Sequence, residues 1–308
     1  MDQRYPQAVL VSCVVPWDEN ECFMEESFRA QVASLITSGV THLYVFGTAG
    51  EGHAVDTERF RHVVKAFRAE THHEGIHPQV GVIALSTANV IERIAMAYDM
   101  GFRMFQVSLP CWGVLNDTEL LTFFKDVCGA FPDSQFLHYN LPRAGRVLTA
   151  ADYRRIADEV PNLVATKLTG SNVNLARDVM RLVPEVQHFF TEPLFAVGSG
   201  FGPCSLLSSF GPLSMTMARR YFEAGRNGQR EEVFELARQY AELSERLFAP
   251  MGGQVLTDGA YDKIIARVVD HDIPMRLLSP YEAFTEDVCA ECEKIFRRHY
   301  SDWVEDHE

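Results

Sequence analysis

Residues 42–70 read HLYVFGTAGEGHAVDTERFRHVVKAFRAE, and this stretch combines a strand, a glycine-rich loop and a helix. His42–Phe46 is a short, mostly apolar run that ends at a glycine, which is typical of a strand buried on both faces. Asp56 or Thr57 then supplies the N-terminal cap of a helix that runs to about Glu70. The stretch therefore predicts one βα unit of a parallel sheet.

The same unit recurs along about the first 210 residues, with about 27 residues between successive strands. Eight units of this size predict an α/β protein with a closed (β/α)8 TIM barrel, in which each strand is followed by a helix. The expected strands are Val9–Val15, His42–Phe46, Val80–Ala84, Arg103–Val107, Gln135–Tyr139, Leu163–Lys167, His188–Phe190 and Cys204–Leu207.

The pattern changes beyond about Leu213, where only helical periodicity remains. We interpret the last three helices as an extension that packs on the barrel. The chain is thereby divided into a catalytic barrel, 1–228, and a C-terminal helical extension, 229–308. The expected helices of this part span about 214–226, 230–248, 258–270 and 280–299.

The charge balance excludes some classes of partner. The chain carries 28 Lys+Arg against 42 Asp+Glu, a net charge of −14. Nucleic acids and anionic membranes bind clustered cationic side chains, so neither is expected as a partner. No apolar stretch reaches the length of a membrane span, and no signal peptide is evident. Seven cysteines, an odd number, favour free thiols in a reducing compartment, so we expect a cytoplasmic protein.

The loop after the second strand is the first candidate for ligand binding. It reads Gly47-Thr48-Ala49-Gly50-Glu51-Gly52, and its small residues let backbone N–H groups approach an anion closely. In a barrel of this kind the active site lies at the loops that follow the strands. The segment lacks the Gly-Lys-Ser/Thr ending of a P-loop and the G-x-G-x-x-G dinucleotide pattern. It is suited to a carboxylate or a phosphate.

Two further strand ends carry reactive side chains. Lys167 closes an apolar strand, and burial there lowers the pKa of its amine, so that the neutral form can attack a ketone and form a Schiff base. The alternative is a lysine that reaches solvent at the strand end. Tyr139 ends the preceding strand, and its alternative role is to pack on the barrel rim.

These three segments together resemble the dihydrodipicolinate synthase / N-acetylneuraminate lyase family. Gly47–Glu51, the run Tyr139-Asn140-Leu141-Pro142 and Lys167 occur in the order and spacing of that family, and the resemblance runs from about Val9 through the C-terminal helices. The family comprises pyruvate-dependent class I aldolases, dehydratases and synthases on a TIM barrel. Its members are commonly tetrameric, so the resemblance implies a homotetramer.

The resemblance also implies roles for the residues. Lys167 would form the imine with a 2-oxo acid such as pyruvate, and Tyr139 would be the proton shuttle with Thr48 in the relay. The backbone N–H groups of Gly47 and Ala49 would hold the pyruvate carboxylate, although Ala49 replaces a hydroxyl side chain that many members have. No metal and no organic cofactor is expected, because the lysine itself supplies the electron sink.

The acceptor side departs from the synthases. Cys111-Trp112 stands where dihydrodipicolinate synthases have tandem tyrosines, and the stretch looks more like the hydratase-aldolases that cleave benzylidenepyruvates. Trp112 would then form an apolar wall for an aromatic or hydrophobic aldehyde, or else lie at a subunit interface. Arg143 resembles the arginine that holds a second substrate carboxylate, with Arg146 as the competing choice. Other residues expected to line the pocket are Thr169, Thr191 and Cys204, while Glu51 is expected to brace its loop.

The sequence therefore predicts a lyase that forms or breaks a C–C bond, with pyruvate as donor or product and an aldehyde as the second partner. Alternatives within the enzyme class are a 2-keto-3-deoxy sugar acid aldolase or dehydratase, and a dihydrodipicolinate synthase-like enzyme. Sialic acid lyases use a segment after the seventh strand to bind sugar hydroxyls, and Glu192 is the one acidic residue that remains of it here. Phe190 and Pro193 replace polar or small residues of that segment, which makes a sugar substrate less favoured. A different class is a catalytically inactive protein that binds a 2-oxo acid.

Overall fold

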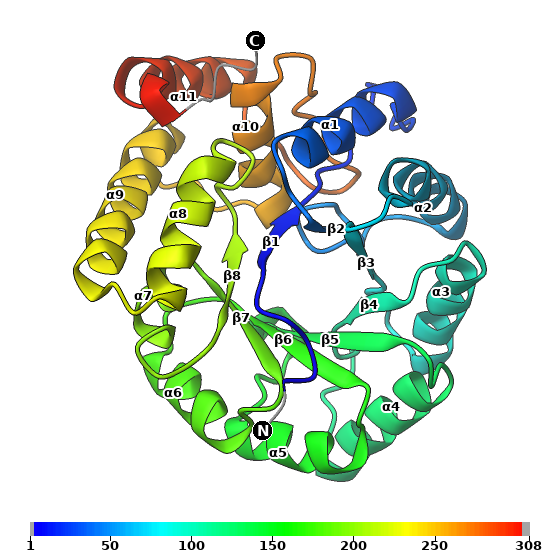
Figure 1. The fold of residues 1–308 in the computed structure, drawn as a ribbon. Coiled ribbons are helices and arrows are strands. Elements are labelled where there is room, and N and C mark those ends of the chain that lie inside the picture. Colours follow the sequence, from blue (N-terminus) through cyan, green and yellow to red (C-terminus); the bar gives the residue numbers. More distant parts are fainter. Residues whose placement is uncertain (1–2, 304–308) are drawn as a thin grey trace.

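The computed structural model describes residues 3–303, and these form the closed parallel barrel that the sequence predicts. Each strand pairs with its neighbours in chain order, and β1 closes the barrel against β8 (Figure 1). The strands are β1 (Val9–Ser12), β2 (His42–Val45), β3 (His77–Gly81), β4 (Met104–Val107), β5 (Gln135–Asn140), β6 (Leu163–Leu168), β7 (Gln187–Thr191) and β8 (Ser205–Ser208).

The helices form a ring around the barrel, with a further group at the C-terminal end (Figure 1). Side-chain caps fix several of their starts, as the Asp56 carboxylate does when it accepts from Arg59 N at the start of α2. The helices are α1 (Glu25–Thr37), α2 (Thr57–Thr71), α3 (Thr87–Asp99), α4 (Asp117–Gly129), α5 (Ala150–Glu159), α6 (Val173–Leu182), α7 (Glu192–Gly198), α8 (Met215–Arg226), α9 (Arg230–Phe248), α10 (Asp258–Val269) and α11 (Glu286–His299), with 3-10 turns at Pro142–Ala144, Ala249–Met251 and Ser301–Trp303.

The third strand differs from its prediction. It spans His77–Gly81 rather than Val80–Ala84. The first three residues of this strand are not part of an apolar run, so the prediction from sequence left them outside the sheet. Inside the barrel, however, the buried Gln79 side chain accepts a hydrogen bond from Gln106 Nε2 at 2.8 Å. The barrel interior thus contains a polar pair that an apolar strand pattern does not anticipate.

Two other boundaries were also wrong. The first strand ends at Ser12 instead of Val15. The last helix begins at Glu286, not at 280, because the Thr285 side chain accepts from Val288 N and caps it there. The short helix α7, directly after β7, was not predicted.

The core has two parts. A large cluster fills the space between the strands and the surrounding helices. A smaller cluster fills the barrel interior and consists of Tyr5, Ala8, Leu10, Tyr44, Met104, Leu137, Val164, Ala165, Phe189 and Leu207. Bulky residues thus fill the barrel interior, and in barrels of this type ligands bind at the end where the strands meet their βα loops.

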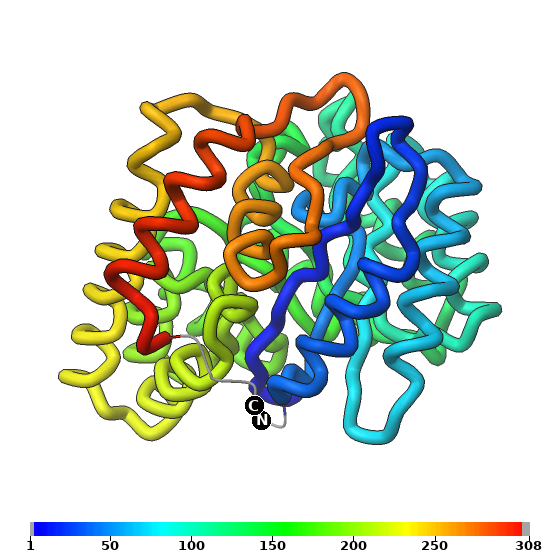
Figure 2. Tube along the Cα trace, turned by 90° about the horizontal axis from the view of Figure 1, so that it is seen from above, coloured from blue at the N-terminus to red at the C-terminus, as the bar shows by residue number. Residues whose placement is uncertain are grey.

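The helix α10 connects the C-terminal part of the chain to that end of the barrel. In both views it lies between α1 and the α9–α11 group (Figures 1 and 2). The division of the chain between 228 and 229 stays a prediction, since α10 contributes side chains to the barrel pocket described below. Among the described residues no helix is both long and apolar enough to cross a membrane.

Candidate active site

Lys167 lies on β6 with 2% of its surface exposed. Its Nζ donates a hydrogen bond to the Tyr44 hydroxyl at 2.8 Å. The same nitrogen lies 4.1 Å from the centre of the Tyr44 ring and 4.0 Å from that of Tyr139. The lysine therefore does not reach solvent, and the alternative of an exposed strand-end lysine is excluded.

Burial lowers the pKa of Lys167 from its usual value of 10.5 to about 7, while the carboxylates of Asp262 and Asp258 oppose this shift. At neutral pH a substantial fraction of the amine is therefore unprotonated. An unprotonated amine carries the lone pair that attacks a carbonyl carbon. The environment of Lys167 thus favours the neutral amine, which is the form that can act as a nucleophile.

Tyr139 stands beside Lys167 because β5 and β6 pair with these two residues as partners. Burial raises the pKa of Tyr139 to about 12, and a hydrogen bond with the Thr48 side chain partly offsets that effect. The phenol therefore keeps its proton at neutral pH and can donate it. The fold therefore brings together three residues that the sequence predicted at separate strand ends, Tyr139, Thr48 and Lys167.

The loop after β2 approaches the amine closely at Gly47. A Cβ atom built on Gly47 would lie 2.6 Å from the Tyr44 ring and 3.5 Å from Lys167 Nζ, so only glycine fits there. Two non-glycine residues here have left-handed backbone, Phe46 (φ 64°) directly before the loop and Glu51 (φ 58°) within it. Such conformations persist only where the surroundings hold them in place.

Glu51 holds the loop in this conformation, in agreement with the bracing role expected for it. Its side chain is fully buried and accepts hydrogen bonds from Trp17 Nε1 at 3.0 Å and from Leu278 N at 2.7 Å. It also forms an ion pair with Lys263 of α10 at 3.0 Å, in which both side chains are fully buried. The C-terminal part of the chain therefore fixes the loop that faces the reactive amine.

A cavity of about 540 Å³ opens over Lys167. Its lining includes four residues from the predicted set, Ala49, Tyr139, Thr169 and Thr191, in addition to Lys167 and Arg143. The remaining lining residues are Ser12, Tyr44, Leu141, Pro142, Gly170, Leu207, Ser208, Ser209, Asp258 and Asp262. Thr48 lies at the edge and lines the neighbouring cavity instead.

Sequence reasoning missed the closest partner of Lys167, which is Tyr44. Burial raises the pKa of Tyr44 well above its usual value of 10.0, and a hydrogen bond with the Ser12 side chain opposes the shift. Its hydroxyl is therefore uncharged and links β1 to the amine on β6. The signal available in the sequence was its position in β2, since alternate residues of a barrel strand point inward.

Two carboxylates on α10 were also missed. Asp258 and Asp262 are one helical turn apart and both line the pocket. Burial raises the pKa of Asp262 from 3.8 to about 7, as does the charge of Asp258, while Lys167 opposes the rise. Helical periodicity gave no sign that this helix docks against the barrel mouth.

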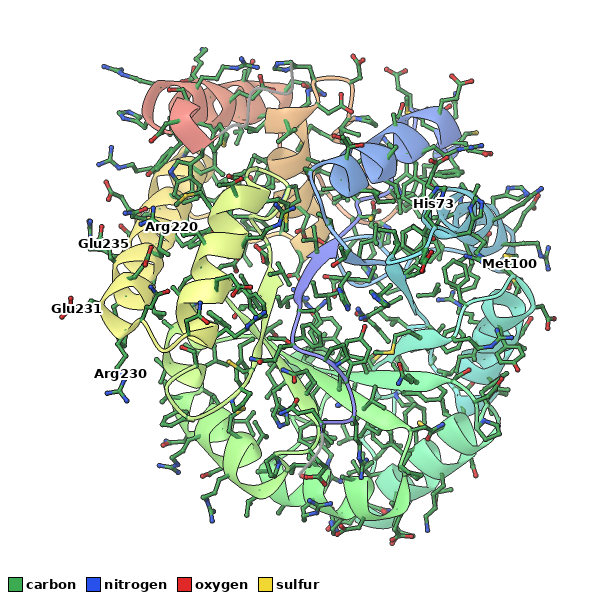
Figure 3. The ribbon with its side chains drawn as sticks, viewed as in Figure 1. His73, Met100, Arg220, Arg230, Glu231 and Glu235 are labelled. Carbon is green, nitrogen blue, oxygen red and sulfur yellow. The ribbon has the colours of Figure 1, made fainter. Side chains whose placement is uncertain are left out.

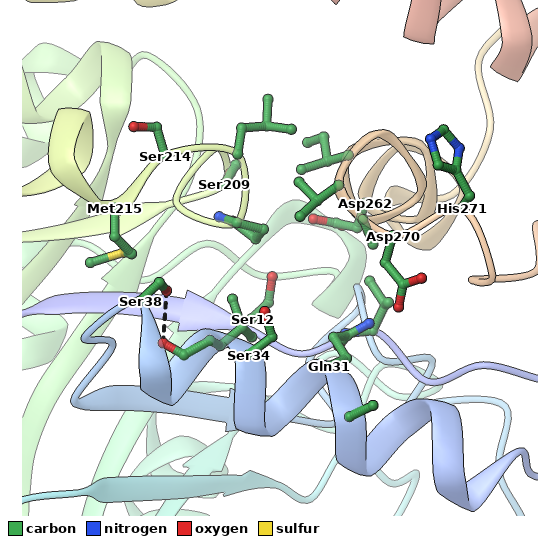
Figure 4. Close-up of a pocket in the computed structure, with 18 of the residues that line it drawn as sticks. Ser12, Gln31, Ser34, Ser38, Ser209, Ser214, Met215, Asp262, Asp270 and His271 are labelled. Carbon is green, nitrogen blue, oxygen red and sulfur yellow. Dashed lines mark hydrogen bonds between the residues drawn. The ribbon is translucent and has the colours of Figure 1, made fainter. Parts of the chain in front are cut away.

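A further cavity of about 550 Å³ lies between α1, α8 and α10. It shares Ser12, Ser209 and Asp262 with the pocket over Lys167. In Figure 4 these three residues lie on different segments around the cavity, with Gln31 on α1 and Asp270 farther along α10. Asp262 therefore stands at the boundary between the two cavities.

The structure distinguishes the two candidate arginines. Arg143 lines the pocket, whereas Arg146 lies outside it and donates to the Asp117 and Asp152 carboxylates at 2.7 and 2.9 Å. Arg143 itself donates to both carboxylate oxygens of Asp258, through Nη1 at 2.7 Å and Nη2 at 2.6 Å.

The predicted residues Cys204 and Trp112 lie away from the pocket over Lys167 and from its apolar neighbour. Cys204 is buried at the start of β8, at the opposite end of the strand from Ser208, and packs in the core beside Gly198. Trp112 is 90% exposed and lines neither this pocket nor its neighbour. All seven cysteines are free.

The neighbouring cavity measures about 660 Å³ and shares Leu141 and Arg143 with the pocket over Lys167. Much of its lining is apolar, although Thr48, His53 and Glu282 also contribute. The apolar lining residues are Ile83, Ala84, Leu85, Leu109, Leu141, Ala144, Val255, Leu256 and Pro280. Within residues 3–303, no group of three or more His, Cys, Asp and Glu side chains is arranged to hold a metal ion.

Comparison with known proteins gives both relatives and structural neighbours. A 4-hydroxy-tetrahydrodipicolinate synthase from Exiguobacterium is 27% identical over 179 residues, 58% of this chain and 60% of that protein. A trans-O-hydroxybenzylidenepyruvate hydratase-aldolase from Pseudomonas putida is 25% identical over 168 residues, 54% of this chain and 50% of that protein. The chain thus spans half to about three fifths of the length of these curated relatives.

The fold is also that of YagE from E. coli, a prophage protein of the dihydrodipicolinic acid synthase family solved in complex with pyruvate. The TM-score is 0.84 at 16% identity, with 95% of this chain and 98% of that chain covered. A profile of the Dihydrodipicolinate synthetase family matches residues 5–296, which include every strand, the loop at Gly47, and Lys167. The chain belongs to the dihydrodipicolinate synthetase family.

Proposed function

We propose that this chain is a Schiff-base-forming class I lyase that acts on a 2-oxo acid, with pyruvate as product or donor. The observation that carries the proposal is the buried Lys167 amine, whose pKa is lowered to about 7 and whose partners are a neutral phenol and two aromatic rings. Family membership supports the same chemistry.

The reaction begins when the lone pair of Lys167 Nζ attacks the C2 carbon of pyruvate. The carbinolamine that results loses water and leaves a protonated imine, which draws electrons from C3. A proton lost from C3 gives an enamine, whose C3 attacks the carbonyl carbon of an aldehyde. In the cleavage direction the C4 hydroxyl loses its proton and the C3–C4 bond breaks, which gives the aldehyde and the enamine. C3 of the enamine then takes up a proton, and hydrolysis of the resulting imine releases pyruvate and the free amine.

The residues around Lys167 suit the proton transfers that these steps require. Tyr139 holds a proton at neutral pH and stands beside the amine, so it can donate to the departing hydroxyl and take a proton back. The backbone at Gly47 lies close enough to Nζ for its neighbouring N–H groups to hold the pyruvate carboxylate. Thr48 is linked to Tyr139 by a hydrogen bond and extends this relay.

The acceptor is an aldehyde that is at least partly hydrophobic. The support is the cavity of about 660 Å³ that continues from the Lys167 pocket across Leu141, with an apolar wall formed by residues such as Ile83 and Leu109. An aromatic or branched body buried there would gain about 25 cal/mol for each Å² of apolar surface removed from water. The similarity to a hydratase-aldolase points in the same direction.

A 2-keto-3-deoxy sugar acid aldolase or dehydratase is the second candidate. It is favoured by the hydroxyl side chains among the residues that line the pocket, which are Ser12, Thr169, Thr191, Ser208 and Ser209. Both candidates pass through the same imine, and an aldehyde panel with aromatic and polyhydroxylated members distinguishes them by the ratio of their kcat/KM values.

Trapping of the imine tests the proposal. The wild-type protein is incubated with pyruvate and borohydride, and its intact mass is measured beside that of Lys167→Ala. A reduced pyruvyl adduct is expected on the wild type and on Lys65→Ala, which removes an exposed lysine, but not on Lys167→Ala. An adduct retained by Lys167→Ala, mapped to another lysine, would contradict the assignment.

A further inference from the structure

The cations around the pocket are few. Among the described residues, Arg143 is the one cationic side chain besides Lys167 that lines the pocket. Its guanidinium is held by the Asp258 carboxylate in a bidentate pair, with nitrogen–oxygen distances of 2.6 and 2.7 Å. This geometry is the one that a carboxylate of a ligand would adopt on the same arginine. The position where a second substrate carboxylate would bind is therefore taken by a residue of the protein.

The pair has little value as a stabilising element. The side chains of Arg143 and Asp258 are 54% and 39% exposed, and ion pairs in such surroundings are strongly screened by solvent. Its position is informative instead, because Arg143 lines both the Lys167 pocket and the apolar cavity next to it. A substrate that extends from one to the other passes the pair.

Asp258 is held in place by the rest of α10. It lies in the first turn of that helix, which is anchored to the barrel by the buried ion pair between Lys263 and Glu51. A carboxylate fixed next to an arginine competes with a free ligand at a high effective concentration. Asp262, on the same face of α10, also lines the pocket. The contribution of α10 to the pocket lining is therefore acidic.

We propose that Asp258 determines acceptor specificity by occupying Arg143, so that the pocket takes an acceptor with an uncharged body and rejects one with a carboxylate. This inference rests on the proposed function, since the acceptor is defined relative to the Lys167 imine. An enzyme with an unpaired arginine at this position could bind a substrate carboxylate there, and Asp258 prevents such binding in this chain.

Two 2-oxo acids of equal length test the inference. In 2-oxopentanoate and 2-oxoglutarate, the atoms beyond C3 occupy the place of the acceptor, and they end in a methyl group and a carboxylate, respectively. Wild type is expected to form the borohydride-reduced adduct with 2-oxopentanoate in preference to 2-oxoglutarate. Asp258→Asn is expected to shift that ratio toward 2-oxoglutarate by about tenfold or more, because a freed guanidinium gains a charge-assisted hydrogen bond.

Two further variants make the result specific. Asp258→Asn combined with Arg143→Gln is expected to lose the gain, because the freed cation is gone. Glu235→Gln breaks a matched bidentate pair with Arg238 on the outer face of α9, where Figure 3 labels Glu235, and it is expected to leave the ratio at the wild-type value. An unchanged ratio in Asp258→Asn, or a gain that persists in the double variant, would overturn the inference.

A binding measurement separates this inference from the proposed function. Glutarate carries carboxylates but no ketone, so its affinity by titration calorimetry does not depend on the imine. Asp258→Asn is expected to bind glutarate more tightly than wild type, and Arg143→Gln is expected to reverse the gain. If no 2-oxo acid gives an adduct, the lyase function fails while the glutarate comparison still decides the role of Asp258.

Discussion

Lys167 and Lys263 are both buried lysines at the same end of the barrel, but their surroundings differ. Lys167 Nζ contacts the Tyr44 hydroxyl and two aromatic rings, and no carboxylate among the described residues forms an ion pair with it. Lys263 Nζ lies 3.0 Å from the Glu51 carboxylate and also donates to the Arg276 carbonyl. Burial lowers the pKa of both amines, but at Lys263 the charge of Glu51 opposes that change directly.

This difference supports the reactive role proposed for Lys167 and a structural role for Lys263. A buried amine that has a carboxylate in contact is stabilised in its charged form, and it then joins the segments that carry the two groups. An amine surrounded by neutral partners is shifted toward its uncharged form and keeps its lone pair available. The fold thus uses one residue type for two purposes, and the matched substitutions below test that distinction.

The largest expected effect follows from the substitution Lys167→Met. Methionine has a similar length but no amine, so imine formation and turnover should fall by about 10⁴-fold or more. The protein should remain folded, because the change removes a desolvated amine that is in direct contact with no carboxylate among the described residues, so it leaves no ion pair broken. Borohydride trapping and a denaturant titration on the same sample check both statements. A variant with residual turnover above that level would show that Lys167 is not the nucleophile.

The same substitution at the other lysine should have the opposite outcome. Lys263→Met leaves the Glu51 carboxylate buried without its cation, which costs about 3–5 kcal/mol in the free energy of unfolding. The double variant Lys263→Met with Glu51→Gln should recover part of that loss, because no unpaired charge remains. Chemical denaturation measures both. Equal stability of Lys263→Met and wild type would mean that the ion pair does not anchor the loop.

A smaller effect is expected from Tyr44→Phe, which keeps the ring and removes the hydroxyl. Lys167 Nζ loses its hydrogen-bond acceptor at 2.8 Å, so the amine is held less well for attack. The rate of imine formation should fall about tenfold, with the stability changed by about 1 kcal/mol or less. Single-turnover trapping gives the rate. Tyr240→Phe, whose hydroxyl is buried and without a protein partner, serves as the control.

The smallest expected effect is a shift in pH dependence. Imine formation requires the neutral amine, so its rate in wild type should rise with pH and level off above the Lys167 pKa of about 7. The Asp262 carboxylate raises the pKa of Lys167, so Asp262→Asn should move the midpoint to lower pH. The exposed Asp126→Asn should not move it. A midpoint near 10 in wild type would contradict the lowered pKa.

The comparison also shows how far the sequence alone was informative. Lys167, Tyr139 and the loop at Gly47 were predicted because each closes an apolar strand, and parallel strands of a barrel end at one rim. The family resemblance then gave them roles. The local pattern contained enough information because each of these residues lies at the strand end of the same repeated βα unit.

The residues of α10 could not be predicted in this way. The helical period of that segment identified a helix at about 258–270, but not the barrel mouth as its partner. Asp258, Asp262 and Lys263 reach the site only through tertiary packing, which a single amphipathic pattern does not specify. The inward-facing Gln79 of β3 was missed for a related reason, since its partner, Gln106, lies on another strand.

The anchoring of the Gly47 loop by α10 has a consequence for the order of events during synthesis. The eight strands are complete at Ser208, about fifty residues before Asp258 leaves the ribosome. At ordinary elongation rates this interval lasts on the order of a few seconds. During that time the strands lack the Lys263 anchor and the carboxylates that α10 contributes to the pocket. The Gly47 loop therefore gains the ion pair that fixes it only after all eight strands have been made.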